Sequence, residues 1–102
     1  MKYSKKIINL FNTILALKNQ KEAKQFLRDL LTESEIIEFS HRWQAAQMLD
    51  NNIPYTQIIK ETGLSSTTVA RISKWLIKGM GGYRLMLDRL HHSKPSRGKG
   101  LR

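Results

Sequence analysis

The segment KETGLSSTTVARISKW, residues 60 to 75, combines a single glycine with a run of four hydroxyl residues. Apolar residues recur at helical spacing on both sides of Gly63, which predicts two helices joined by a tight turn. Glycine favours such a turn because it lacks the side chain that resists a positive φ. The contacts that hold the two helices together are expected from Ile58, Leu64, Val69 and Ile72. This is the helix-turn-helix pattern, whose second helix enters the major groove of DNA.

The second helix of the pattern, about residues 66–78, has two chemically different faces. At 100° per residue, its inner stripe consists of Val69, Ile72 and Leu76. Its outer face begins with a hydroxyl and continues with cations, in the order Thr67, Arg71, Lys74 and Lys78. Ser65 or Ser66 can cap the first N–H groups, and the remaining hydroxyls can hydrogen-bond to base edges. The long cations can reach bases or phosphates, so this face is predicted to bind double-stranded DNA.

The formal net charge of +10 is unevenly distributed along the 102 residues. Residues 1–62 contain nine Lys or Arg and seven Asp or Glu, a net of +2. Residues 63–102 contain nine bases and one acid, Asp88, a net of +8. A basic excess confined to one part of a small domain indicates a polyanionic partner, most often nucleic acid. A basic surface that only keeps the protein in solution is the alternative.

The remaining chain also has helical periodicity, so the predicted fold class is all-α with about six helices. We expect helices near residues 4–17, 20–31, 33–51, 54–62, 66–78 and 83–91, within a single domain of residues 1–91. Thr32 and Glu35 have the spacing of a capping box before the third helix. Left-handed conformations are expected in the turn before the last helix, at Gly79, Gly81 and Gly82. The basic segment 92–102 is expected to be a disordered tail.

The first predicted helix is apolar on more than one side. Its large apolar residues are Ile7, Ile8, Leu10, Phe11, Ile14, Leu15 and Leu17. A helix on the surface of a monomer needs one apolar stripe, whereas a helix that is apolar on most sides must be enclosed. A chain of 102 residues can bury only a modest core. We therefore expect a second copy of the chain to provide the enclosure, which predicts a homodimer.

Several classes of function lack the residues that they require. Cysteine is absent, which excludes disulfides and thiol chemistry from this chain. No apolar run approaches the ~20 residues that span a bilayer, and no signal-peptide cleavage site follows the apolar run near the start. We therefore expect a cytoplasmic protein without a membrane partner. The hydroxyls, carboxylates and three histidines form no recognisable catalytic or metal-binding motif, so no enzyme activity, metal or other cofactor is expected.

A long part of the chain resembles the Trp repressor superfamily. The resemblance runs from about Leu30 to Leu87, in LLTESEIIEFSHRWQAAQMLDNNIPYTQIIKETGLSSTTVARISKWLIKGMGGYRLML. It is strongest for the YerC/YecD branch, whose members carry similar ETG…T(V/I)(S/A)R and GGY(K/R)LML segments. The resemblance implies an intertwined homodimer whose N-terminal helices interlock. Its two recognition helices would contact half-sites about 34 Å apart on an approximately palindromic DNA site.

The resemblance also implies which residues lie against DNA. By position, the base-reading region falls on Ser65, Ser66, Thr67, Thr68 and Ala70. Tyr55 and Thr56, at the front of the fourth helix, would lie along the phosphates. The helical pattern adds the cations Arg71, Lys74 and Lys78 to this DNA-binding set.

The founding repressor of the family binds tryptophan as a corepressor, and its pocket is only partly matched here. Arg42 and Arg71 occupy the positions of two arginines that enclose the indole, and Thr32 matches a threonine at the pocket edge. Ile72 and Trp75 replace a glycine and a serine, and overfilling a packed site costs ~1–3 kcal/mol per misfit. We therefore expect these two side chains to fill the pocket and tryptophan not to bind. A differently shaped ligand site is the alternative.

These features predict a dimeric, sequence-specific DNA-binding protein that acts as a transcriptional repressor or related regulator. Two alternatives stay open. One is a DNA-targeting accessory protein of a transposition or recombination system, which would need a separate catalytic partner because this chain has no catalytic acidic cluster. The other is an accessory protein that binds structured RNA with the same basic face.

Overall fold

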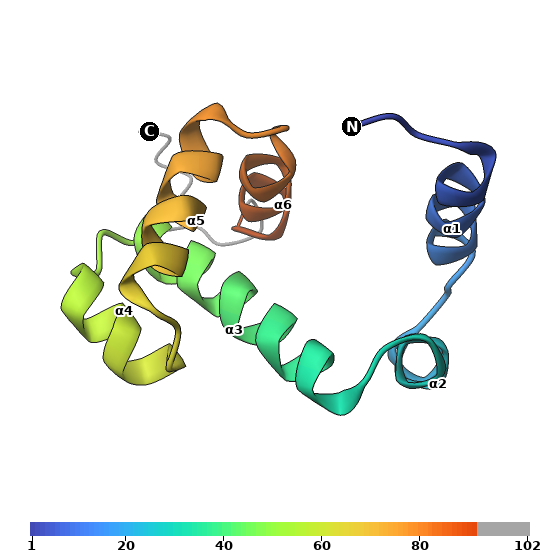
Figure 1. Ribbon diagram of the computed structural model, residues 1–102, viewed down its shortest axis with the longest axis horizontal. Coiled ribbons are helices and arrows are strands. Elements are labelled where there is room, and N and C mark those ends of the chain that lie inside the picture. The colour runs from blue at the N-terminus through green and yellow to red at the C-terminus, as the bar shows by residue number, and fades with distance from the viewer. Residues whose placement is uncertain (92–102) are drawn as a thin grey trace. The chain divides into compact units, whose positions relative to one another are not determined.

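The structure, a computed structural model, describes residues 1–91, which form six α-helices and no strand (Figure 1). The helices are α1 (Lys5–Leu15), α2 (Gln20–Leu30), α3 (Glu33–Asp50), α4 (Tyr55–Thr62), α5 (Ser66–Lys78) and α6 (Gly82–His91). The predicted all-α class is confirmed, and each helix end lies within two residues of its prediction. Within residues 1–91, no helix combines the length and the apolar character needed to cross a bilayer. The predicted tail, residues 92–102, lies outside the described residues.

The chain divides into two compact units, Met1–Ile36 and Ile37–Arg102. The first unit contains α1, α2 and the start of α3. The side chain of the residue before α1 and of the residue before α2 caps the first turn of that helix. Ser4 Oγ accepts a hydrogen bond from the Ile7 N–H at 3.3 Å, and Asn19 Oδ1 accepts one from the Glu22 N–H at 2.9 Å. None of residues 1–36 is buried within the described chain. This unit therefore has well-formed helices but no enclosed core of its own.

The start of α3 is fixed by the predicted capping box. The Thr32 N–H donates to Glu35 Oε1 at 2.9 Å, and the Glu35 N–H donates to Thr32 Oγ1 at 3.1 Å. Each side chain thus satisfies a backbone N–H that the helix itself leaves without a partner. The reciprocal pair confirms that these two residues specify where α3 begins.

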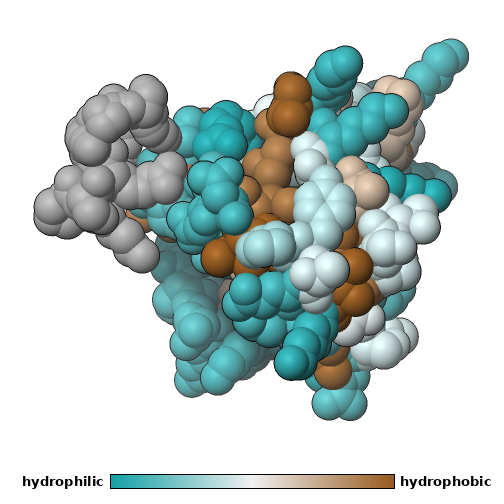
Figure 2. All heavy atoms as spheres, turned by 90° about the vertical axis from the view of Figure 1, so that its left-hand side faces the viewer, coloured by the Kyte–Doolittle hydropathy of each residue, from teal (hydrophilic) through white to brown (hydrophobic). Residues whose placement is uncertain are grey.

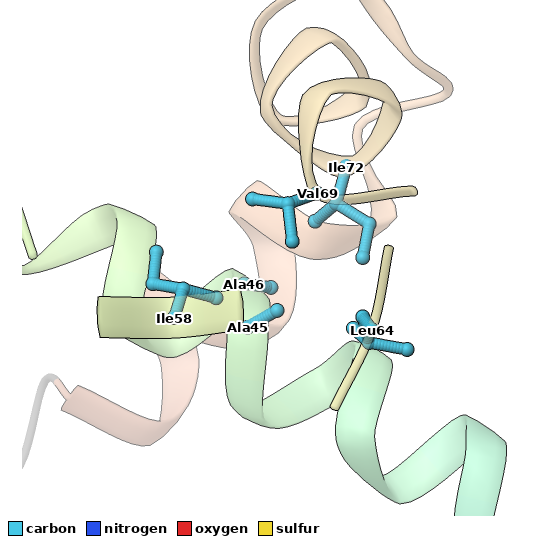
Figure 3. Packing of buried hydrophobic residues seen from close by; sticks show 6 residues of the cluster. All are labelled: Ala45, Ala46, Ile58, Leu64, Val69 and Ile72. Atoms are coloured by element: carbon cyan, nitrogen blue, oxygen red, sulfur yellow. The ribbon is translucent and has the colours of Figure 1, made fainter. Parts of the chain in front are cut away.

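The core of the second unit lies where α3, α4 and α5 meet (Figure 3). Its buried side chains come from all three helices and the turn after α4: Ala45, Ala46, Ile58, Leu64, Val69 and Ile72. Figure 3 shows Val69 and Ile72 of α5 directed toward the two alanines of α3. The four residues expected to hold the helix-turn-helix together are all in this core. Their burial fixes which side of α5 faces the protein, and therefore which side faces solvent.

The turn between α4 and α5 is set by a glycine and a threonine. Gly63 has φ +76°, the left-handed conformation that the sequence predicts, and its N–H donates to the Ile59 carbonyl at 2.9 Å. The hydroxyl of buried Thr62 donates to the Ile58 carbonyl at 2.7 Å and accepts from the Leu64 N–H at 3.2 Å. The chain therefore turns from α4 into α5 without leaving the Leu64 N–H unpaired inside the core.

The glycine turn between α5 and α6 differs from the prediction. Of its three glycines, Gly81 alone has a positive φ, +87°, whereas Gly79 has φ −84° and ψ −153°. Gly79 is instead constrained by space, because a Cβ at this position would lie 2.6 Å from the carbonyl oxygen of Trp75. That carbonyl also accepts the Gly79 N–H at 3.0 Å. The requirement for glycine here comes from a close backbone approach, which the sequence pattern does not reveal.

Helix α6 is fastened to the end of α3 by an ion pair. Arg84 Nη2 donates to Asp50 Oδ1 at 2.9 Å, and Arg84 Nη1 donates to Asp88 Oδ1 at 3.2 Å. The Asp50 side chain is only 7% exposed, so this carboxylate needs its cationic partner. The rings of Trp43 on α3 and Tyr83 on α6 also stack on each other, with their centroids 6.3 Å apart. Helices α3 and α6 are therefore joined by both polar and aromatic contacts.

Replacing Thr62 with valine should destabilise the protein, because the change removes a buried hydroxyl at nearly constant volume. The Leu64 N–H would lose its acceptor, and an unpaired buried donor costs about 1–3 kcal/mol. Urea denaturation should report a decrease of that size in the free energy of unfolding. The control is Thr56→Val on the exposed face of α4, which should change stability by less than about 0.5 kcal/mol. Equal losses in the two variants would contradict the role given to the Thr62 hydroxyl.

Candidate nucleic-acid interface

The outer face of α5 presents the four side chains that the helical pattern selected. Thr67, Arg71, Lys74 and Lys78 are exposed, whereas Val69 and Ile72 on the opposite side are completely buried. No ion pair joins the three cations to any residue in the described part of the chain. Helix α5 itself contains no acid. This recognition face, as we call the exposed side of residues 66–78, therefore carries positive charge that is available to an external anion.

The four hydroxyl residues at the start of α5 have different environments. Ser65 is the N-cap, and its Oγ accepts from the Thr68 N–H at 3.1 Å. The same Oγ donates to Thr68 Oγ1 at 3.0 Å, so these two hydroxyls are engaged with each other. Ser66 and Thr67 are exposed, and neither hydroxyl makes a hydrogen bond within residues 1–91. Two of the four hydroxyls therefore stabilise the helix start, and two are directed to solvent.

The start of α4 contributes an exposed helix N-terminus to the same unit. Pro54 precedes the helix and supplies no side-chain cap, while Tyr55 and Thr56 in the first turn are exposed. Uncapped N–H groups at a helix start, together with the helix dipole, favour a negatively charged group. Figure 2 shows the face on which α4 lies, where hydrophilic residues predominate and hydrophobic residues form a narrow band. This composition suits contact with a hydrated, charged partner.

The residues predicted from the corepressor pocket have separate structural roles. Ile72 is completely buried in the core of the second unit, and Trp75 is 40% exposed at its surface. Arg42 Nε donates to Glu38 Oε2 at 3.1 Å on the same helix. Thr32 belongs to the first unit, where its hydroxyl forms the capping box. Ile72, which stands where the resemblance expects a glycine, is thus a core residue, whereas Trp75 is only partly covered by the described residues.

Trp75 lines an apolar groove of about 790 Å³ that sequence reasoning did not identify. The aromatic groove, as we name it, is lined by Trp43, Trp75, Lys78, Gly79, Met80, Gly82, Tyr83 and Met86. Burial raises the pKa of the Tyr83 phenol above its usual value of 10.0, an effect that nearby Arg42 partly opposes. The sequence signal was the tyrosine of GGYRLML, to which no role could be given without knowing that α6 faces Trp43. Within residues 1–91, no group of three or more acidic or histidine side chains could hold a metal ion.

Comparisons with known proteins agree with this architecture. The sequence model of the family described as Trp repressor protein matches residues 5–91. YerC of Bacillus subtilis strain 168, described as an uncharacterized protein, is 37% identical over 90 residues, which cover 88% of this chain and 86% of YerC.

Two crystal structures have a similar fold. A TrpR-like protein from Eubacterium eligens ATCC 27750 has a TM-score of 0.82 and 36% identity, covering 85% of this chain and 90% of the other. A candidate Trp repressor from Staphylococcus aureus has a TM-score of 0.80 and 37% identity, covering 85% and 87%. Because both the family match and these similarities extend over most of the six helices, the chain belongs to the Trp repressor family.

Proposed function

We propose that this protein is a sequence-specific regulator of transcription that binds double-stranded DNA as a homodimer and acts as a repressor. The observation that carries the proposal is the recognition face of α5, which is exposed, cationic and without an ion-pair partner in the described chain. Membership in the Trp repressor family supports DNA as the polyanion. On this proposal the protein binds rather than catalyses.

The recognition face divides into a reading part and an anchoring part. Ser66, Thr67 and Ala70 have short side chains in the first half of α5, so the helix backbone can approach the base edges closely. Arg71, Lys74 and Lys78 are long and cationic, which suits contacts with phosphates on either side of the groove. Ser65 and Thr68 support this arrangement by capping the helix rather than by contacting bases. Tyr55 and Thr56 would hold a phosphate at the start of α4.

The apolar surface of the first unit supports the homodimer. Ile8, Phe11 and Leu15 on α1 are exposed, and no residue of this unit is buried. A second copy would cover such side chains and would also supply a second recognition helix. Two helices related by a two-fold axis can contact half-sites one helical turn apart. Dimer formation and palindromic DNA recognition are therefore parts of one proposal.

The proposed regulator does not use tryptophan as a corepressor. A bound indole would need the volume that Ile72 occupies, and Ile72 is packed against the alanines of α3 in the core. Moving a completely buried isoleucine would open the junction that holds α5 in place. The proposal therefore assigns control of DNA binding to something other than this ligand.

Replacing Arg71 with alanine should weaken DNA binding and make it less sensitive to salt. If the Arg71 of each copy in the dimer neutralises one phosphate, the slope of log K against log [salt] should become smaller in magnitude by about 1.8, or about 0.9 for each copy. Fluorescence anisotropy at several salt concentrations measures both quantities. Arg28→Ala, which removes the same charge from α2, should leave the slope unchanged. An unchanged slope for Arg71→Ala would remove Arg71 from the phosphate contacts.

Thr67→Val and Thr68→Val should differ in their effects on sequence preference. Losing a base contact from Thr67 should redistribute the preferred bases, at about 1–3 kcal/mol for the affected position. Losing the Thr68 hydroxyl should disturb the helix cap and leave the preferred bases as they are, because that hydroxyl is engaged with Ser65. Selection from random duplexes with each variant compares the two. A shifted preference for Thr68→Val alone would contradict the assignment.

Added tryptophan should not change the affinity for DNA. Isothermal titration calorimetry should detect no binding of tryptophan to the protein, and anisotropy with a selected duplex should give the same dissociation constant with and without it. A tenfold increase in affinity, about 1.4 kcal/mol, would show that the pocket opens despite Ile72.

A further inference from the structure

The first unit carries a concentration of positive charge that the balance of residues 1–62 conceals. Residues 1–28 contain seven Lys or Arg and one acid, Glu22, a net of +6. Residues 29–62 contain two bases and six acids, a net of −4, so the total for residues 1–62 is only +2. None of the seven cations forms an ion pair within residues 1–91. The start of the chain is therefore a second region of excess positive charge, separate in sequence from α5.

Part of this charge is gathered on one side of α2. Lys21 and Lys24 are exposed and lie three residues apart, within about 60° of each other around the helix. Lys18 is also exposed and precedes Lys21 by three residues, and its N–H donates to Glu22 Oε1 at 2.9 Å. The opposite side of α2 consists of half-buried apolar residues, Ala23, Phe26 and Leu27. We call Lys18, Lys21 and Lys24 the lysine strip.

The lysine strip lies where cations do not help the helix. Lys21 is in the first turn of α2, where the helix dipole favours an acid over a cation. Lys24 has a like charge three residues before it and another, Arg28, four residues after it. Residues at these spacings are neighbours on a helix, so their like charges repel and destabilise it. A helix that only needed to be soluble would be more stable with acids at some of these positions, so the placement favours a negatively charged partner.

We propose that the lysine strip binds the DNA duplex that α5 reads, at phosphates that the recognition face does not contact. The inference rests on the proposed function and adds a second contact surface to it. A lysine ammonium binds phosphate as a point charge, and phosphate contacts carry no direct information about sequence. The strip would therefore increase the affinity of the protein for DNA without changing which bases it prefers.

Duplex DNA is favoured over other polyanions because the same chain would already hold it. Once α5 has bound, the strip is tethered to the duplex, and its contact with a phosphate becomes effectively intramolecular. Lys21 and Lys24 are about 4.5 Å apart along the axis of α2, and duplex DNA has one negative charge per about 1.7 Å of its own axis. Both lysines can therefore meet a phosphate. A helix that binds a membrane would instead need exposed apolar residues opposite its cations, whereas Phe26 and Leu27 are half-buried.

Removing the two helical lysines tests this contact. The variant Lys21→Gln/Lys24→Gln should bind more weakly to a duplex that contains the selected site and extends about one helical turn beyond it at each end. If each lysine of each copy neutralises one phosphate, the slope of log K against log [salt] should become smaller in magnitude by about 3.6, or about 0.9 for each lysine. Selection from random duplexes should return the same site as for the parent. Lys21→Arg/Lys24→Arg keeps both charges and should retain the parent slope.

The matched control is Arg28→Gln/Arg89→Gln, which removes the same formal charge from two exposed positions outside the strip. The Arg28 guanidinium donates to the Leu31 carbonyl at 3.3 Å, which holds it toward the end of α2. This variant should keep the parent slope. An equal loss of slope in the two double variants would show an effect of net charge alone and would overturn the inference.

Thermal melting followed by circular dichroism separates a binding role from a structural one. Because the lysine variant loses mutually repelling charges, its Tm should be no lower than that of the parent. A lower Tm would show that the two lysines serve the fold, and it would contradict the inference.

Duplex RNA and vesicles that contain phosphatidylserine serve as the other polyanions. If the lysine variant loses binding to either of them while its binding to DNA is unchanged, the inference is overturned. The proposed function is tested separately, by the preference of the parent for its selected duplex over an unrelated one. If the parent shows this preference and Lys21→Gln/Lys24→Gln keeps the parent slope, this inference fails and the proposed function stands. If the parent shows no preference, the proposed function itself fails.

Discussion

The burial of one side of α5 against α3 and α4 is the constraint on which the rest depends. Val69 and Ile72 pack against Ala45 and Ala46, while Gly63 permits the turn that brings α5 to this position. Because those side chains point inward, the helical period directs Thr67, Arg71 and the two lysines outward. The orientation of the proposed DNA contacts therefore follows from core packing. If α5 turned so that Val69 and Ile72 left the core, its exposed side would turn by the same angle.

Much of this arrangement follows from local sequence rules. The Gly63 turn, the Thr32–Glu35 capping box and the inner stripe of α5 are determined by residues a few positions apart, so the sequence is sufficient to predict them. The space restriction at Gly79 and the engagement of Thr68 by Ser65 depend on atomic distances that no residue pattern encodes.

The aromatic groove shows the same limit for tertiary contacts. Trp43, Trp75 and Tyr83 belong to three different helices, and only their packing brings the three rings to one surface. The sequence instead indicated that Trp75 fills a ligand pocket. Within residues 1–91, Ile72 lies in the core and Trp75 is 40% exposed.

The account is tested most directly by asking which groove of DNA the protein occupies. Methylation interference compares guanine N7, which lies in the major groove, with adenine N3, which lies in the minor groove. With α5 in the major groove, methylated guanines should block binding in two symmetric clusters about one helical turn apart, whereas methylated adenines at the same half-sites should not. Interference from minor-groove methylation alone, or a single cluster without a symmetric partner, would contradict the account.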